Sequence, residues 1–422
     1  MKIAILTIGS RGDTQPYIAL AMGLMQNGFD VKLVVPENVA ALVHEANISC
    51  ATLPIDVKAS IEKRSKDKKF QKGIFQKIRI GKKRIKKELP PLIDESLVAC
   101  EGADLILYGG ISFSFYFQIQ EFLQTPNLPL FLQPITFTKK MAPMFLPVSS
   151  LGSLVNSLAH HWMICILWTT YRHGINAWRK TRNLEKITKG NPFKKLFSKQ
   201  QTMLYGYSPN VFPSPRDWSP LQYPAGYWFW HKKDDYQPPE SLVDFLEAGP
   251  APVYIGFGSM GGILGEDTIE IVTKAVKLSK CRAVFLTGWG QEASDRLSPD
   301  IYCMEQAPHD WLFPRMAALV HHGGAGTTAA GLRAGKPAQI ISHISDQMFW
   351  SFRLVALKAG LRFIDRKKLT AAKLARSIKI LLNNKDLSRG AAAISEKLQQ
   401  EDGVANAVSF IQSYIERYVN SN

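Results

Sequence analysis

A glycine-rich break between a strand pattern and a helix pattern is the feature that most limits what this chain can form. Residues 317–321 are an apolar run typical of a buried strand, and Gly323, Gly324 and Gly326 interrupt it. Residues 327–334 have the composition of a helix. Such a junction directs backbone N–H groups and the positive end of a helix dipole at one point. The sequence therefore predicts an anion site here, with phosphate as the expected anion.

Strand and helix patterns alternate along the chain. In the first half, strand patterns alternate with helix patterns (strands at 2–7, 31–35 and 104–108, helices at 15–26 and 38–46). A second series begins after residue 240 (strands at 253–257, 283–287 and 338–341, a helix at 268–278). This alternation predicts an α/β protein with two doubly wound, Rossmann-like domains. Ligands of such sheets bind beyond the carboxyl ends of the strands, so Asp13, just after the first strand, is expected to point into a crevice.

Length and composition set the expected domain boundaries. A chain of 422 residues with 46% hydrophobic content has room for two domains with their own cores. Seven prolines between residues 207 and 240 indicate a linker. We expect an N-terminal domain, a linker, a C-terminal domain and a final helix that crosses back onto the first domain (1–212, 213–240, 241–402 and 403–422).

The positive charge of the chain is concentrated in one segment. Residues 58–88 hold fourteen basic and three acidic residues, which is eleven of the seventeen net positive charges. Ile74, Phe75, Ile78 and Ile80 alternate with these charges. Two interpretations stay open, a solvated loop and a patch that meets an anionic membrane surface. Because the rest of the chain is only mildly basic, the sequence argues against a nucleic-acid binder.

Cysteine usage and hydropathy bear on the compartment. The five cysteines are scattered without C-x-x-C pairing, which favours neither a disulfide framework nor a zinc site and predicts a reducing, cytoplasmic environment. The apolar run at the start is too short for a signal peptide, and no stretch is long enough to span a bilayer. We therefore expect a soluble or peripheral protein.

Polar residues at the ends of the second series of strands are candidate ligands of the anion and of what it carries. His322 precedes the glycine turn and could donate to a phosphate oxygen, while Thr327 could cap the helix or share that oxygen. Asp346 and Gln347 follow the next strand, where they could hold vicinal sugar hydroxyls; Asp346 could instead only cap its helix. A third glycine turn, with Gly258 and Ser259, could face the same pocket.

Taken together, the motifs resemble those of a known family. They are Gly9-Ser-Arg-Gly-Asp-Thr-Gln-Pro, Gly256-Phe-Gly-Ser-Met, Ala307-Pro-His-Asp-Trp-Leu-Phe, His321-His-Gly-Gly-Ala-Gly-Thr-Thr and Asp346-Gln347. In this order they are similar to the sterol 3β-glucosyltransferases and, less closely, to the glycosyltransferases of glycopeptide antibiotics. The resemblance implies the GT-B fold, with an acceptor-binding N-terminal domain and a C-terminal domain for the nucleotide sugar. It also implies inverting, metal-independent transfer of a sugar, usually from UDP-glucose, to a hydroxyl of a lipophilic acceptor.

The resemblance also assigns roles to single residues. Asp13 would be the general base, although it could instead be the N-cap of the helix expected at residue 15. Donor contacts would come from both domains (Ser10, Arg11, Gly258, Ser259, Ala307, His309, His322, Gly324, Gly326, Thr327, Asp346 and Gln347). Gln306 and Ala330 stand where plant relatives have tryptophan and glutamate, which leaves uracil against thymine open. No D-x-D motif occurs, so no metal clamp or cofactor is expected and the helix dipole, glycine amides and His322 would stabilise the leaving group.

The acceptor side is less defined. Candidate lining residues are aromatic or methionine side chains (Phe113, Phe115, Met141, Met144, Trp162 and Trp228). The helix pattern over residues 149–180 has a wide apolar face, which could pack in the core, form an acceptor wall or dip into lipid. A sterol-like acceptor is the first hypothesis. A UDP- or dTDP-sugar transferase of natural-product biosynthesis and a nucleotide-sugar-binding protein without catalysis are the alternatives.

Overall fold

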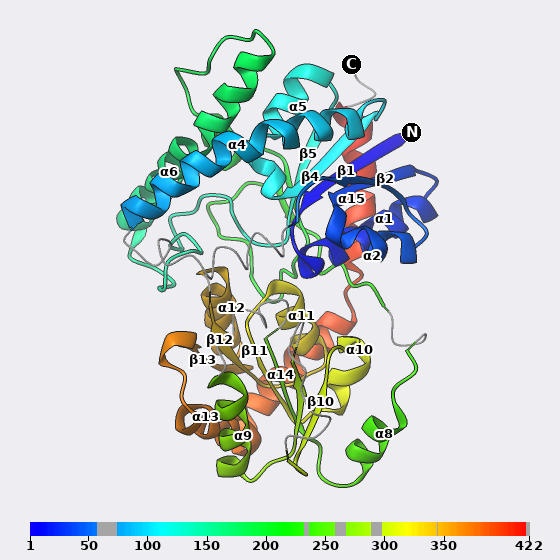
Figure 1. The fold of residues 1–422 in the computed structure, drawn as a ribbon, viewed down its shortest axis with the longest axis vertical. Helices are drawn as coiled ribbons and strands as arrows, with labels where there is room; N and C mark the ends of the chain where they lie inside the picture. Colours follow the sequence, from blue (N-terminus) through cyan, green and yellow to red (C-terminus); the bar gives the residue numbers. More distant parts are fainter. Residues whose placement is uncertain (57–73, 232–235, 258–266, 288–297, 344, 419–422) are drawn as a thin grey trace.

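The computed structural model describes residues 1–56, 74–231, 236–257, 267–287, 298–343 and 345–418. The chain forms two lobes, each built on one parallel sheet, with the N-terminal lobe at the top of Figure 1 and the C-terminal lobe below it. The predicted α/β class with two doubly wound sheets is therefore confirmed. Within these ranges, no helix combines the length and the apolar content needed to cross a membrane.

The first sheet has seven parallel strands in the order β3-β2-β1-β4-β5-β6-β7. Its strands are β1 (Lys2–Ile8), β2 (Asp30–Pro36), β3 (Ser49–Leu53), β4 (Leu105–Gly110), β5 (Asn127–Phe131), β6 (Met203–Tyr205) and β7 (Gln222–Pro224). The strand order reverses between β1 and β4, where Ile8 pairs with Gly110. A crevice is expected beyond the carboxyl ends of strands at such a reversal.

Helices cover both faces of this sheet (Figure 1). They are α1 (Arg11–Gln26), α2 (Ala40–Glu45), α4 (Ile74–Cys100), α5 (Tyr116–Leu123), α6 (Ser153–Thr181) and α7 (Pro192–Leu196). The helix expected from residue 15 begins at Arg11, because the Ser10 carbonyl already accepts from the amides of Asp13 and Thr14. The helix expected over 149–180 is α6, and its small residue Gly174 lies against the backbone of Ile85 in α4.

The second sheet has six parallel strands in the order β10-β9-β8-β11-β12-β13. Its strands are β8 (Val253–Gly256), β9 (Ala283–Leu286), β10 (Ile301–Met304), β11 (Ala318–His321), β12 (Ala338–Ser342) and β13 (Gly360–Asp365). Its helices are α8 (Glu240–Glu247), α9 (Asp267–Ser279), α10 (His309–Leu312), α11 (Ala325–Arg333), α12 (Ser345–Ala356), α13 (Ala371–Asn383) and α14 (Lys385–Gln399). Here the order reverses between β8 and β11, where Gly256 pairs with His321.

The chain crosses between the lobes twice. The first sheet includes β7, which lies inside the range expected to be linker; three residues are too few to give a strand pattern. The last helix, α15 (Gly403–Tyr418), returns to the N-terminal lobe and packs on α1, where Val408 and Ile411 share a core with Leu24. Figure 1 shows α15 behind the first sheet, near the N-terminus.

The close approach of α1 and α15 depends on Gly23. A Cβ atom built there would lie 2.4 Å from Cγ1 of Val404, which is too short for a real contact. Gly23→Val is therefore expected to push α15 away and lower the free energy of unfolding by about 1–3 kcal/mol. Gly81→Ala in α4 is the control, because its Cβ would meet nothing closer than 3.9 Å and should leave stability equal or higher. Urea unfolding measures both; equal stability of Gly23→Val and wild type would contradict this packing.

Candidate active site

A large cavity lies between the lobes, at the carboxyl ends of both sheets. Its volume is about 2150 Å³. The segments after β1 and β4 line it from the N-terminal lobe, and those after β10, β11 and β12 line it from the C-terminal lobe. A pocket for one drug-sized ligand is typically about 300–1,000 Å³. The cavity is therefore large enough for two substrates at once.

The predicted anion site is the junction of β11 and α11. Gly323 has φ 90° and turns the chain, and Gly324 is the N-cap of α11 without a side-chain cap. The amides of the first turn of a helix have no helical acceptor and carry the positive end of its dipole. A Cβ at Gly324 would lie 2.6 Å from Nε2 of His322, so any larger residue there would displace this ring. Gly324, Gly326 and Thr327 all line the cavity, so this corner is open to a ligand.

Thr327 does not cap α11. It is the third residue of the helix, which begins two residues earlier than expected. The hydroxyl that bonds the backbone here belongs to Thr328, which donates to the carbonyl of Gly324 at 2.9 Å. Of the two interpretations offered for Thr327, a contact to the ligand is the one that remains.

Buried histidines surround the corner in their neutral form. Burial, reinforced by the neighbouring His343 and His309, lowers the pKa of His322 to about 3. Burial and the nearby Arg11 lower the pKa of His309 to about 4. His321 accepts from the amide of Gly323 through Nδ1 at 3.0 Å and holds the turn. Near neutral pH these rings therefore offer one N–H each and no charge.

Asp13 lies in the first turn of α1 and lines the cavity from the N-terminal lobe. Its Oδ2 accepts from the amide and the hydroxyl of Ser10, both at 2.8 Å. Among the described residues its Oδ1 accepts no hydrogen bond. Asp13 is not the N-cap, which is Ser10. Gly9 makes room for this carboxylate, because a Cβ there would lie 2.4 Å from Cβ of Asp13.

Asp346 and Gln347 open α12 on the opposite side of the cavity. Burial, followed by the negative charge of Asp13, raises the pKa of Asp346 to about 6. Gln347 is 2% exposed, and its Oε1 accepts from the amide of His343 at 2.6 Å. Two carboxylates from different lobes thus share one cavity closely enough for the charge of one to affect the other.

A contact that the sequence did not predict joins the two lobes. Nη1 of Arg11 donates to Oε1 of Gln306 at 2.7 Å across the cavity. Gln306, Ala307 and His309 follow β10 and line the C-terminal side. His343, which was also missed, follows β12 in the same way as His322 follows β11, so the rule of strand ends could have found it. Gly258 and Ser259 lie outside the described residues.

Three of the six expected acceptor residues line the cavity. These are Phe113, Met144 and Trp228. Phe115 and Met141 belong to the hydrophobic core of the N-terminal lobe and are not among the lining residues. Trp162 is 73% exposed, so its expected place in the pocket is wrong. His160 and Met163 of the same helix line the cavity, so Trp162 lies on another side of α6.

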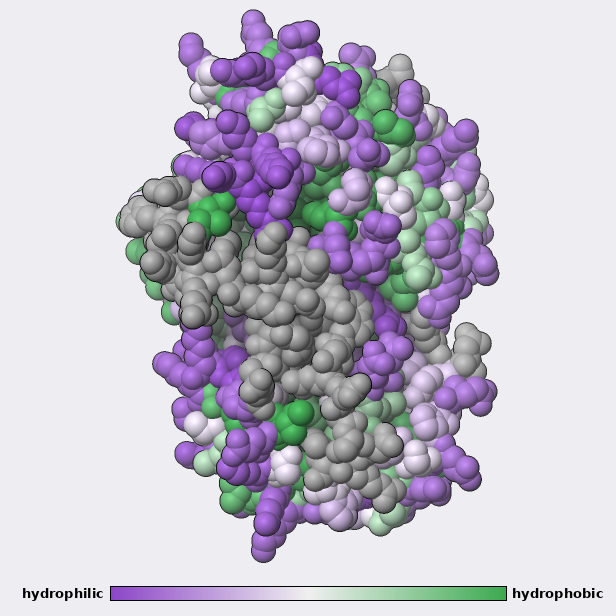
Figure 2. Space-filling model, viewed as in Figure 1, coloured by the Kyte–Doolittle hydropathy of each residue, from purple (hydrophilic) through white to green (hydrophobic). Residues whose placement is uncertain are grey.

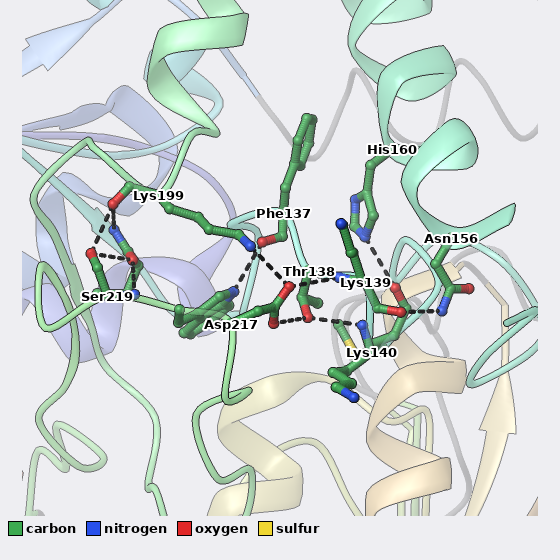
Figure 3. A network of polar contacts seen from close by, with 12 residues as sticks. Phe137, Thr138, Lys139, Lys140, Asn156, His160, Lys199, Asp217 and Ser219 are labelled. Carbon is green, nitrogen blue, oxygen red and sulfur yellow. Dashed lines mark hydrogen bonds and ion pairs between the residues drawn. The ribbon is translucent and has the colours of Figure 1, made fainter. Parts of the chain in front are cut away.

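A polar network holds the wall that carries Met141 and Met144 (Figure 3). The carboxylate of Asp217 accepts from the hydroxyl of Thr138 at 2.7 Å, and from the amide of Lys139 and Nζ of Lys199 at 2.9 Å. From α6, Asn156 donates to the carbonyl of Lys139. His160 contacts the carbonyl of Met141 in the same way, at 3.1 Å. The network fixes α6 relative to the cavity.

Comparisons with known proteins agree with this architecture. Residues 3–96 match the glycosyltransferase family 28 N-terminal domain, and residues 283–408 match the erythromycin biosynthesis protein CIII-like C-terminal domain. A sterol 3-beta-glucosyltransferase of Arabidopsis thaliana is 32% identical over 430 residues, which cover 98% of this chain and 68% of that protein. One from Cryptococcus neoformans is 31% identical over 443 residues, covering 99% of this chain. The chain spans 27% of the length of this fungal relative.

Solved structures similar to this chain are glycosyltransferases. The glycotransferase of kitacinnamycin has a TM-score of 0.68 at 16% identity, with 98% of both chains covered. VinC, solved in complex with dTDP, has a TM-score of 0.65 at 15% identity, with 99% of this chain and 100% of VinC covered. At such identities the likeness establishes the fold, which is the GT-B arrangement of two facing doubly wound domains.

The Asp217 network gives a prediction about stability. Burial alone would raise the pKa of Asp217, but its hydrogen-bond donors and the charge of Lys199 outweigh burial and lower the pKa to about 2. A carboxylate with a lowered pKa stabilises the fold above its unfolded pKa, and this contribution is lost as pH falls toward 2. Asp217→Asn should therefore lower the free energy of unfolding by about 1–2 kcal/mol at pH 7. The difference should shrink between pH 4 and pH 2; chemical denaturation over this range that shows a constant difference would contradict the network.

Proposed function

Because this chain belongs to the sterol 3-beta-glucosyltransferase family, we propose that it transfers glucose from UDP-glucose to the hydroxyl of a sterol-like lipophilic acceptor. The transfer inverts the anomeric carbon and needs no metal ion. The observation that carries the proposal is the placement of Asp13 and the start of α11 in different lobes on one cavity. A base on one side and an anion site on the other are what a single displacement requires.

The base step uses the two oxygens of Asp13 differently. Ser10 holds Oδ2, which fixes the carboxylate and leaves Oδ1 for the acceptor hydroxyl. As Oδ1 takes the proton, the acceptor oxygen forms its bond to the anomeric carbon and the bond from that carbon to the diphosphate breaks. General-base assistance of this kind typically contributes about 10²–10⁴-fold in rate. Attack from the side opposite the leaving group inverts the anomeric configuration.

The start of α11 stabilises the leaving diphosphate. Backbone amides of its first turn and the helix dipole meet the negative charge that develops on the phosphate oxygens. Neutral His322 and the hydroxyl of Thr327 add hydrogen bonds. These groups do the work for which other enzymes use a bound cation, which supports metal independence.

Asp346 and Gln347 hold the donor sugar. The carboxylate of Asp346 accepts hydrogen bonds from sugar hydroxyls. The backbone amide of His343 donates to Oε1 of Gln347 and so orients this side chain, whose NH₂ group donates to the sugar. Apolar side chains of the N-terminal lobe, among them Phe113, Met144 and Leu167, suit a lipophilic acceptor. Arg11 reaches the C-terminal lobe, where its guanidinium donates to Gln306. When the donor binds, the same guanidinium can donate to a phosphate oxygen instead.

The proposal predicts the effect of removing the base. Asp13→Asn keeps the side-chain volume but cannot take the proton, so turnover should fall by about 10² or more. Binding of UDP-glucose, followed by thermal shift, should be retained. Product is measured by mass spectrometry after incubation with UDP-glucose and a panel of sterols, flavonoids and hydroxy-lipids.

Glu305→Gln is the matched control, because Glu305 is an exposed carboxylate at the rim of the same cavity. It should keep wild-type turnover. Wild-type turnover in Asp13→Asn would overturn the base assignment, and no transfer by the wild-type protein would favour a binding protein without catalysis. Replacing UDP-glucose by dTDP-glucose separates the two donors, and unchanged rates with EDTA test metal independence.

The raised pKa of Asp346 predicts how donor binding depends on pH. Burial and Asp13 place this pKa at about 6 in the unliganded protein, so the carboxylate loses its charge as pH falls below that value. Donor affinity should weaken by roughly tenfold between pH 7.5 and pH 5. Asp346→Asn should bind more weakly at pH 7.5 and show little pH dependence. Titration calorimetry with UDP-glucose measures both; a wild-type affinity that stays constant to pH 5 would contradict the role of Asp346.

A further inference from the structure

The outer surface of α6 carries large apolar side chains that no described element covers. Leu154, Leu158 and Trp162 are four residues apart and so share one side of the helix, Val155 is next to Leu154, and Leu151 lies just before the helix. Their exposed fractions, in this order, are 75%, 57%, 73%, 48% and 44%. We refer to these five residues as the outer apolar face. Contiguous apolar surface of this kind usually marks an interaction site.

The opposite side of the same helix lines the cavity. His160, Met163 and Leu167 face the space between the lobes. Phe145, in the loop before α6, both lines the cavity and is 47% exposed, so it stands at the rim. The outer apolar face and the apolar part of the cavity are therefore separated by the thickness of one helix.

The outer apolar face is fixed in place and is not a stray exposed helix. Asn156 and His160, from the first half of α6, hold the carbonyls of Lys139 and Met141 (Figure 3). In the second half, Gly174 packs against the backbone of Ile85 in α4. Turning the helix to bury Leu154 and Trp162 would break these contacts, so the fold itself keeps them outside.

Basic side chains lie beside α6 in two places. Lys139 and Lys140 are exposed beside the start of α6. Further along α6, beyond Trp162 and close to Gly174, α4 carries the exposed Lys83, Lys86 and Lys87. Hydrophilic surface follows α4 in Figure 2. The sequence of α6 contains no acidic residue.

Arg172 of α6 and Lys82 and Lys86 of α4 lie close enough to His173 for their charges to act on it. Burial, then Arg172, Lys82 and Lys86, lower the pKa of His173. The positive potential is therefore shared by α4 and α6. Glu88 is the one acidic residue of α4 near this end, and Arg84 pairs with it at 2.7 Å.

We propose that the outer apolar face of α6, with the basic residues beside it, docks this protein on a lipid bilayer that contains anionic lipids. Leucines and a tryptophan at the lipid–water boundary, with lysines on the same helix hairpin and at its start, are the pattern of helices that lie in the interface plane. Phe145 at the rim then brings the cavity mouth to the bilayer surface. This orientation rests on the proposed function, since it delivers a lipophilic acceptor to Asp13.

Vesicle binding tests the docking surface without using activity. Wild-type protein should sediment with phosphatidylcholine vesicles that contain phosphatidylserine, at least tenfold more than with phosphatidylcholine alone, and less in high salt. Leu154→Glu/Leu158→Glu should lose this binding by tenfold or more. Leu278→Glu is the matched control, because Leu278 is 52% exposed on α9 of the other lobe and should bind as wild type.

Fluorescence quenching tests whether the bilayer contacts α6 itself. Lipids brominated in their acyl chains should quench the fluorescence of Trp162, and the quenching should be lost in Trp162→Phe. Equal absence of binding to both vesicle types, or equal binding by the double variant and wild type, would overturn the proposal. Loss of a dimer in the double variant by ultracentrifugation, without vesicle binding, would assign the face to a second copy instead.

Activity separates this inference from the proposed function. With acceptor supplied in detergent micelles, the double variant should transfer glucose at the wild-type rate, while with acceptor in anionic vesicles its rate should fall at least tenfold. If wild-type protein binds vesicles but transfers no glucose in micelles, the docking surface stands and the proposed function fails. Equal rates for wild type and double variant in vesicles would overturn the link between docking and delivery of the acceptor.

Discussion

The relative position of the two lobes, whose sheet edges face each other across the cavity, depends on how the end of the chain packs back on the N-terminal lobe. After α14, Glu401 accepts from the hydroxyl of Ser208 at 2.6 Å and from the amide group of Asn210 at 2.5 Å. Gly403 then passes so close to Gly226 that a Cβ on either would meet backbone atoms within 3 Å. Next, α15 buries Val408 and Ile411 against α1, the helix that carries Asp13. Packing at the far side of the molecule thus acts together with the direct contact of α1 with α11 to set the position of Asp13.

Burial is the main cause of the shifted pKa values of His309, His322 and Asp346 in the cavity. His309 and His322 are neutral, so the positive potential at this corner comes from the start of α11 and from lining arginines such as Arg11 and Arg366. Asp346 is ionised near neutral pH only at a cost, because burial and Asp13 oppose its charge. Its folded-state pKa is above the unfolded value, so ionisation destabilises the unliganded protein as pH rises through 6. Hydrogen bonds from ligand hydroxyls would lower the free-energy cost of ionising Asp346. The unliganded protein thus loses some stability at a residue that binds the ligand.

Local patterns in the sequence carried most of the fold and the corner of the site. Strand runs, the glycine turn at 323–326 and the carboxylate after the first strand depend on neighbouring residues, and they are found in the expected places. Features set by distant residues were missed. The pairing of Arg11 with Gln306 joins residues 295 positions apart, and β7 is defined only by its partner β6.

The direction of α6 shows the same limit. Its apolar residues are numerous enough to suggest a buried face, and only the contacts with α4 and with the loop of Lys139 decide which side is turned inward. The sequence therefore predicts a place for Trp162 in the acceptor pocket, although this side chain is exposed. Sequence periodicity gives the width of an apolar stripe on a helix but not the element against which the stripe packs. The structure is therefore needed to tell which side of such a helix is buried.

The central claim is that the first turn of α11 grips the diphosphate of the donor. Hydrogen–deuterium exchange of the peptide that contains residues 323–328, with and without UDP, tests it most directly, because the amides of residues 325–327 within it have no helical acceptor of their own. The account predicts that UDP slows exchange in this peptide and leaves the core strand β9 unchanged. Exchange that is equally fast with saturating UDP would contradict it.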